Sequence, residues 1–257
     1  MRTSPFSIVR WPNNLLLTVV IFCTGSATQA QTQGPLTGDH IDTSKGDLII
    51  HPVNHASFVM QWNGKIIYVD PVGGAEPYIN LPKPDIVFVT DIHGDHFNPD
   101  TLSSMEGASV VTAPAVYEQA PGIIKHMFTT IMENGDTASW DGIGIEAIPM
   151  YNISEGRLQF HQKGRGNGYL LTMADERVYI AGDTEAIPEM LALKDIDVAF
   201  IPMNLPYTMT VEQAAAAVRT FQPDIVYPYH YRGSDVEEFR RLVGDASSVR
   251  LLDWYKK

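Results

Sequence analysis

The stretch 85-DIVFVTDIHGDHFNPD-100 joins a continuously apolar run to a cluster of histidines and aspartates. The apolar part, 85–90, is typical of a strand that is buried on both faces of its sheet. Asn98 and Pro99 predict the start of a helix, because asparagine caps helix N-termini and proline is favoured at the first helical position. Two of the chain's eight histidines lie between these elements. Loops at strand ends are where a rigid sheet presents polar side chains to a ligand.

The polar part of this stretch reads D-x-H-x-D-H and consists of Asp91, His93, Asp95 and His96. In extended backbone, residues 91, 93 and 95 point the same way, because side chains alternate along a strand. Together with His96 they could reach two adjacent metals, and imidazole and carboxylate suit Zn, Mn or Fe. A solvated polar loop is the alternative. We favour a metal site because the pattern lies between a buried strand and a capped helix.

The rest of the chain predicts an α/β protein of the four-layer αββα sandwich type, with helices covering both outer faces. Asn63-Gly64 is the strongest short hairpin signal, and Thr210 with Gln213 makes a capping box. Strands are expected at 47–53, 56–62, 65–70, 85–90, 109–113, 127–132, 143–149, 157–161, 168–174, 177–181, 197–202, 224–228 and 249–253. Helices are expected at 98–106, 114–120, 187–193, 210–221 and 235–243.

The N-terminal residues predict export. Residues 1–30 have the pattern of a secretory signal peptide, with a basic start, an apolar core too short to span a bilayer, and small residues up to Ala30. An uncleaved N-terminal anchor is the alternative. Residues 31–46 are expected to be a flexible leader, and 47–257 one large domain. We therefore expect a periplasmic or secreted protein with no stable membrane insertion after cleavage.

Charge and cysteine content limit the partners and the kind of metal site. The chain has 18 basic and 30 acidic residues, a formal net charge of −12. This excess of acid predicts that the chain has no nucleic-acid partner. The single cysteine, Cys23, lies in the predicted signal peptide, so the remainder can form neither a disulfide nor a Cys-ligated zinc site. Any metal must be held by histidines and carboxylates.

Four blocks of the sequence resemble the metallo-β-lactamase superfamily. D-x-H-x-D-H is similar to the H-x-H-x-D-H metal motif of that superfamily. The segment 55-HASFVMQWNGKIIYVDP-71 resembles the hairpin and Asp-Pro that precede this motif in the superfamily. The segment 178-VYIAGDTE-185 resembles the one that carries the bridging aspartate, and 225-IVYPYHY-231 resembles the last strand with its metal-binding histidine. The ascorbate-6-phosphate-lactonase-like subgroup is the most similar one, through 148-IPMYN-152, 161-HQKGRGNGYLL-171 and 205-LPYTMTVEQAAAA-217.

The resemblance implies one or two divalent metal ions, with zinc the commonest in the family. Asp183 would bridge the two ions. The second site would consist of Asp95, His96, Asp183 and His230. The first site would consist of Asp91, His93 and Asp183.

The first site departs from the family pattern in two places. Asp91 stands where the family has a histidine, and Tyr151 and Asn152 stand where another is expected. Asn152 or His161 could complete the site. Because carboxylate is a harder ligand than imidazole, Asp91 favours Mn, Fe or Mg relative to Zn. Its added negative charge would also make the metal a weaker Lewis acid.

The activity implied is hydrolysis of a small ester, lactone or phosphoester by metal-activated hydroxide. Asp95 and Asp183 are the expected catalytic residues, and His55 is expected to hold a ligand or to pack in the core. Candidate substrate-binding residues are Tyr151, Asn152, His161, Lys163, Tyr207 and Tyr231. The segment 163-KGRGNG-168 could cradle a phosphate or form a hairpin turn. A mononuclear hydrolase and a non-catalytic binding protein on the same fold are the alternatives.

Overall fold

The computed structural model describes residues 36–255. The predicted signal peptide, 1–30, and the first residues of the predicted leader lie outside the described residues. No helix within 36–255 is long and apolar enough to cross a membrane.

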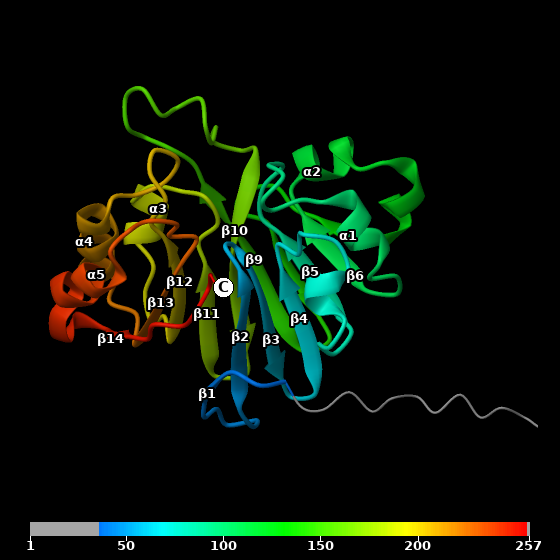
Figure 1. Ribbon diagram of the computed structural model, residues 1–257, viewed down its shortest axis with the longest axis horizontal. Coiled ribbons are helices and arrows are strands. Elements are labelled where there is room, and N and C mark those ends of the chain that lie inside the picture. The colour runs from blue at the N-terminus through cyan, green and yellow to red at the C-terminus, as the bar shows by residue number, and fades with distance from the viewer. Residues whose placement is uncertain (1–35, 256–257) are drawn as a thin grey trace, which may run out of the picture. The chain divides into compact units, whose positions relative to one another are not determined.

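Two seven-stranded mixed sheets carry the fold (Figure 1). The first sheet runs in sequence order through β1 (Asp39–Ile41), β2 (Leu48–Asn54), β3 (Ser57–Trp62), β4 (Lys65–Val69), β5 (Ile86–Val89), β6 (Ser109–Thr112) and β7 (Phe128–Ile131). The second runs in the same way through β8 (Thr137–Trp140), β9 (Ile143–Met150), β10 (Gly166–Met173), β11 (Glu176–Ile180), β12 (Val198–Pro202), β13 (Ile225–Tyr229) and β14 (Ser248–Val249).

Each sheet is antiparallel in its first half and parallel in its second. Pairing changes to parallel at β4 with β5 in the first sheet and at β11 with β12 in the second. The parallel strands are connected by helices: α1 (Pro99–Ser103), α2 (Pro114–Gln119), α3 (Pro188–Leu191), α4 (Val211–Phe221) and α5 (Val236–Val243), with 3-10 turns at Glu76–Tyr78, Gly122–Met127 and Gly244–Ala246. Such connections leave the carboxyl ends of parallel strands free to present ligand-binding loops.

Three apolar clusters make four layers. The central cluster lies between the sheets and contains stacked Phe58 and Phe200 and the fully buried Trp254. A second cluster packs the helices from α3 to α5 on the outside of one sheet, and a third packs α1 and α2 on the outside of the other (Figure 1). The predicted αββα sandwich is therefore confirmed.

Three of the expected elements differ in the structure. Residues 157–161 form turns instead of a strand, because Arg157 bonds to Glu185 and to the carbonyl of Thr208 and holds this segment as a loop. Of the last expected strand, 249–253, only Val249 lies in a strand: β14 begins one residue earlier, at Ser248, and both residues pair with β13. Helix α1 ends at Ser103 instead of residue 106.

The predicted flexible leader, 31–46, contains a strand. β1 pairs with β2 through Asp39, His40 and Ile41. Asp39 is fixed at this edge because its carboxylate accepts hydrogen bonds from Tyr227, at 2.5 Å, and from Arg250, at 2.8 Å. The leader prediction therefore fails from residue 39 onward.

Candidate metal centre

The candidate site lies where strands of both sheets end. The loop after β5 supplies residues 91–96, the segment after β11 supplies Asp183, and β13 is followed directly by His230. Three non-glycine residues of the site, His55, Asp70 and His230, have positive φ values of 54°, 45° and 48°. Left-handed backbone of this kind is uncommon for such residues and concentrates at functional sites.

Asp91, His93 and His161 form the first group of possible metal ligands. His93 Nδ1 lies 2.8 Å from Asp91 Oδ2, and His161 Nε2 lies 3.9 Å from the same oxygen. His161 Nε2 is also 3.2 Å from Asp183 Oδ2. Of the two residues that could complete the first site, Asn152 and His161, His161 is the one that the structure brings next to Asp91 and His93.

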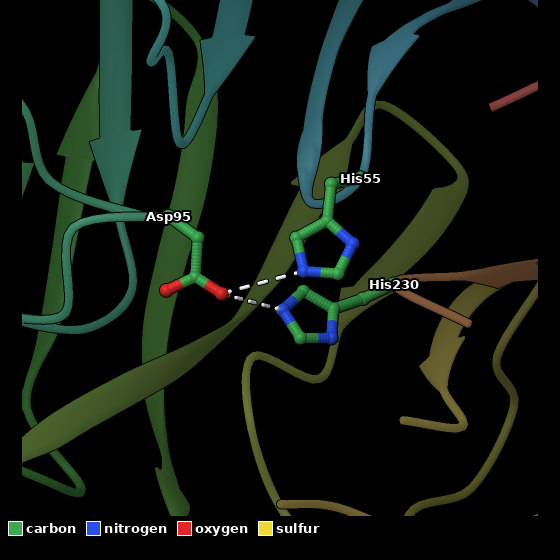
Figure 2. A group of neighbouring side chains, drawn as sticks. All are labelled: His55, Asp95 and His230. Atoms are coloured by element: carbon green, nitrogen blue, oxygen red, sulfur yellow. Dashed lines mark hydrogen bonds and ion pairs between the residues drawn. The ribbon is translucent and has the colours of Figure 1, made fainter. Parts of the chain in front are cut away.

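The second group consists of His96, Asp183 and His230, and a further group of His55, Asp95 and His230 lies beside it. His96 Nε2 lies 3.3 Å from Asp183 Oδ2, and His230 Nε2 lies 3.5 Å from Asp183 Oδ1. Asp95 Oδ2 lies 3.3 Å from His230 Nε2 and equally far from His55 Nε2. Figure 2 shows the Asp95 carboxylate pointing toward the two imidazole rings, whose centroids are 3.7 Å apart.

The distances in both groups also suit side chains that share a metal ion. Four donors placed tetrahedrally at about 2.1 Å from one metal lie about 3.4 Å from one another. Apart from the contact between Asp91 and His93, the pairs above are 3.2 to 3.9 Å apart. Two buried atoms at the centre, His96 Nε2 and Asp183 Oδ1, have no hydrogen-bond partner in the described chain. These residues therefore fit divalent metal ions.

A buried carboxylate orients His96. Asp70 follows β4, is fully buried, and accepts a 2.8 Å hydrogen bond from His96 Nδ1. Thr90 fixes Asp70 in turn through its backbone N–H, at 2.7 Å, and its hydroxyl, at 2.6 Å. A histidine that binds metal usually donates its other ring N–H to such a partner, and this leaves Nε2 directed at the site.

Two further histidines are oriented in the same way. His161 Nδ1 lies 2.6 Å from Asn152 Oδ1, so its Nε2 faces Asp183. His55 Nδ1 lies 2.7 Å from the hydroxyl of Tyr255, so its Nε2 faces Asp95. The interpretation of Asn152 as a possible ligand thus gives way to a role in fixing His161.

The electrostatics of the centre favour ionised carboxylates. Burial raises the pKa of Asp183, but the nearby His230 and His96 outweigh it and bring the pKa well below its usual range. Burial likewise raises the pKa of Asp95, and hydrogen bonds from His230 and His55 lower it further than burial raises it. Ionised carboxylates are the form that binds a cation.

A cavity of about 360 Å³ opens over both groups. Its floor includes His93, His161 and Asp183, and its walls include the residues Phe160, Asn204, Tyr207 and Arg232. The rings of Phe160 and Tyr207 pack edge to face with centroids 5.0 Å apart. Of the predicted substrate-binding residues, His161 and Tyr207 line this cavity.

Three other predicted substrate-binding residues are engaged elsewhere. Lys163 Nζ bonds to Glu189 at 2.6 Å, and the hydroxyl of Tyr151 donates to the same carboxylate at 2.9 Å. Tyr231 packs edge to face on Tyr255, and its hydroxyl donates to a backbone carbonyl. None of the three lines the cavity.

Close packing accounts for two glycines of 163-KGRGNG-168. A Cβ on Gly166 would lie 2.5 Å from the carbonyl oxygen of Thr90, and one on Gly168 would lie 2.7 Å from that of Ala181. These glycines let β10 cross directly beside the ends of β5 and β11. Residues 163–165 form a turn at the end of the connection from β9, and Gly166 to Gly168 lie in β10, so the segment is not a hairpin turn and close packing accounts for its glycines without a phosphate.

Sequence reasoning missed two cations of the site. Arg232 lines the cavity, and Arg165 bonds to Asp91 across 74 residues of sequence. The glycine-rich context of Arg165 was the available signal, because a segment without side chains can approach another backbone closely.

Comparisons with known proteins agree with this geometry. The family model described as a beta-lactamase superfamily domain matches residues 50–230. A UPF0173 metal-dependent hydrolase from Pyrococcus horikoshii is 32% identical over 219 residues, which cover 78% of this chain and 94% of the relative.

Solved structures give the same match. A candidate metal-dependent hydrolase from Parabacteroides distasonis is 40% identical, with a TM-score of 0.76 over 84% of this chain and 98% of its own. A metallo hydrolase from Ignicoccus hospitalis is 27% identical, with a TM-score of 0.68 over 80% of this chain and 94% of its own.

Proposed function

The chain belongs to the metallo-β-lactamase superfamily as a metal-dependent hydrolase, and we propose that it hydrolyses a small ester, lactone or phosphoester with two divalent metal ions. The observation that carries the two-metal proposal is the position of Asp183. Its Oδ2 atom lies 3.2 Å from His161 of the first group and 3.3 Å from His96 of the second. One carboxylate can thus join two sites, as a bridging ligand does.

Divalent metals in such a site supply Lewis-acid polarisation of the scissile bond and a nucleophilic hydroxide near neutral pH. The side chains of this protein hold the ions and orient the substrate. Asp95 lies 3.3 Å from both His55 and His230, so its carboxylate is fixed at the edge of the cavity. The side chains of Asp95 and His93 are 45% and 43% exposed, so these two ligands are the most open to solvent and thus to an entering substrate.

Two features of the cavity wall favour a substrate with an anionic group and an apolar part. Arg232 lines the cavity, is exposed, and has no carboxylate partner within residues 36–255. A guanidinium in this position suits a carboxylate or a phosphate. The paired rings of Phe160 and Tyr207 offer apolar surface on the wall. The ascorbate-6-phosphate-lactonase-like subgroup, predicted from the sequence, is consistent with such a substrate.

The proposal is tested by turnover of charged and neutral substrates. Protein purified without chelator is assayed with esters, lactones and phosphodiesters in the presence of Mn²⁺ or Zn²⁺. We expect hydrolysis that a chelator abolishes and that returned metal restores. We also expect Arg232→Gln to raise KM about tenfold for anionic substrates and to leave KM for neutral ones unchanged.

The alternatives have distinct outcomes in the same assay. Full activity at one metal per chain supports the mononuclear hydrolase. Bound metal without turnover of any substrate class supports the non-catalytic binding protein. An equal rise in KM for neutral and anionic substrates in Arg232→Gln would remove the anionic group from the proposal.

A further inference from the structure

Asp91 is held by a two-point ion pair that the metal motif alone does not disclose. Arg165 Nε lies 3.1 Å from Asp91 Oδ1, and Arg165 Nη2 lies 2.9 Å from Oδ2. The aspartate side chain is fully buried and that of the arginine is 17% exposed. Fork-to-fork pairs of this kind are among the strongest charge-assisted contacts in proteins.

Backbone contacts between β10 and the end of β5 bring Arg165 next to Asp91. Gly166, the next residue after Arg165, packs its backbone against the carbonyl of Thr90 with no space for a side chain. The backbone N–H of Asn167 donates to the same carbonyl at 2.9 Å. Arg165 and Asp91 each adjoin one partner of this contact, so the guanidinium meets the carboxylate.

We propose that Asp91 and Arg165 together take the place of a first-site histidine: Asp91 Oδ2 ligates the first metal, and Arg165 cancels its charge. This inference rests on the proposed metal-dependent function. It makes Arg165 a positioning residue that sets the affinity and the preference of the first site.

The geometry leaves Asp91 free to bind a metal while it is paired. A carboxylate offers about four lone-pair positions, and Arg165 occupies two. Oδ2 also faces His93 Nδ1 at 2.8 Å and His161 Nε2 at 3.9 Å. Both nitrogens belong to the first group, so Oδ2 points at the place where a shared ion would lie.

Charge counting gives the consequence. A neutral imidazole contributes no net charge to a metal site, and an aspartate paired with an arginine also contributes none. The sequence alone suggested that Asp91 weakens the metal as a Lewis acid by adding negative charge. With Arg165 counted, only the change from nitrogen to oxygen remains, which still favours harder metals.

A purely structural role for the pair is the competing explanation. In that case Arg165 only fastens β10 to the motif. Removing it would leave a buried unpaired carboxylate and would destabilise the fold. A loss of stability therefore cannot separate the two explanations, and metal affinity must be measured on folded protein.

The test measures first- and second-site Kd by chelator competition in wild type, Arg165→Gln and Arg165→Lys. Because Arg165→Gln removes a cation beside the metal, we expect first-site Kd to fall about tenfold or more. Arg165→Lys keeps the charge and should stay near wild type. Arg250→Gln is the matched control, since it breaks a partly buried pair with Asp39 and should change stability without changing either Kd.

Asp91 variants complete the test. Asp91→Asn leaves Arg165 unpaired beside the ion, so we expect loss of the first metal and retention of the second. In the double variant Asp91→His with Arg165→Gln, a neutral imidazole returns, and we expect two metals per chain with preference moved toward Zn.

The outcomes separate failure of this inference from failure of the proposed function. Wild-type protein that binds no metal would overturn the proposed function itself. Wild type with two metals, together with unchanged Kd in folded Arg165→Gln and unchanged stoichiometry in Asp91→Asn, would overturn only the role of the pair.

Discussion

At the scale of single residues, the site depends on which ring nitrogen each histidine directs at its centre. Nδ1 of His96 is hydrogen-bonded to Asp70 and Nδ1 of His161 to Asn152, so both histidines direct Nε2 toward the centre of the site. The motif could be read from the sequence because its members are close neighbours. The contacts of Asn152, His161 and Arg165 could not be predicted in this way. Their partners are not close neighbours in the sequence, and local spacing carries no signal for such contacts.

The ligand assignment predicts unequal effects of three histidine substitutions. His96→Ala and His230→Ala should each remove metal and lower activity at least 100-fold, because their neighbours are already committed to other contacts. His126 is exposed and lies outside the site, so His126→Ala should keep the metal content of wild type. Elemental analysis of the three variants checks this. Equal metal loss in all three would mean that the ligand set is wrong.

At the scale of elements, apolar runs and turn signals predicted most strands and helices correctly. The hairpin at Asn63-Gly64 joins β3 to β4, and the capping box of Thr210 with Gln213 starts α4. The errors fall where tertiary contacts decide. β1 is three residues long and depends on Asp39, whose partners Tyr227 and Arg250 are about 190 and 210 residues away. No local pattern could disclose that pairing.

The Asp39 contact predicts a defined dependence of stability on pH. Burial raises the pKa of this carboxyl, but hydrogen bonds from Tyr227 and Arg250 outweigh burial and lower the pKa. A carboxyl whose pKa is lower in the folded protein stabilises the fold above its unfolded pKa, about 3.9. That contribution is lost as the pH falls through the folded pKa.

We therefore expect Asp39→Asn to lower the free energy of unfolding by about 1–2 kcal/mol at pH 7. The difference from wild type should shrink as the pH falls below about 4. Denaturant unfolding at several pH values measures it. Asp141→Asn is the control: its pair with Lys65 is 67% exposed on the aspartate side, and it should change stability little. A difference for Asp39→Asn that is constant with pH would exclude this contribution.

At the scale of the whole molecule, both sheets bring the ends of their parallel strands to one place. Asp91 to His96 come from the first sheet, and Asp183 and His230 come from the second. The superfamily resemblance predicted this arrangement, since its four blocks keep their order. The resemblance could not predict which residues line the cavity. Phe160, Tyr207 and Arg232 belong to loops whose paths depend on long-range contacts.

Export is a further proposal at this scale. The pattern of residues 1–30 predicts that the mature protein begins at or near Gln31 and lies in the periplasm or outside the cell. N-terminal sequencing of the protein from each cell fraction checks it. A cytoplasmic protein that still begins at Met1 would contradict export, and a membrane-bound one that begins at Met1 would support the uncleaved anchor.

The central claim is that Asp183 joins two metal ions, and one crystal structure tests it most directly. Crystals of protein purified without chelator and grown with Mn²⁺ or Zn²⁺ give the metal positions by anomalous scattering. The account predicts two peaks about 3.5–4 Å apart, one beside His93 and His161, the other beside His96 and His230, with Asp183 in contact with both. A single peak, or metal bound without Asp183, would contradict it.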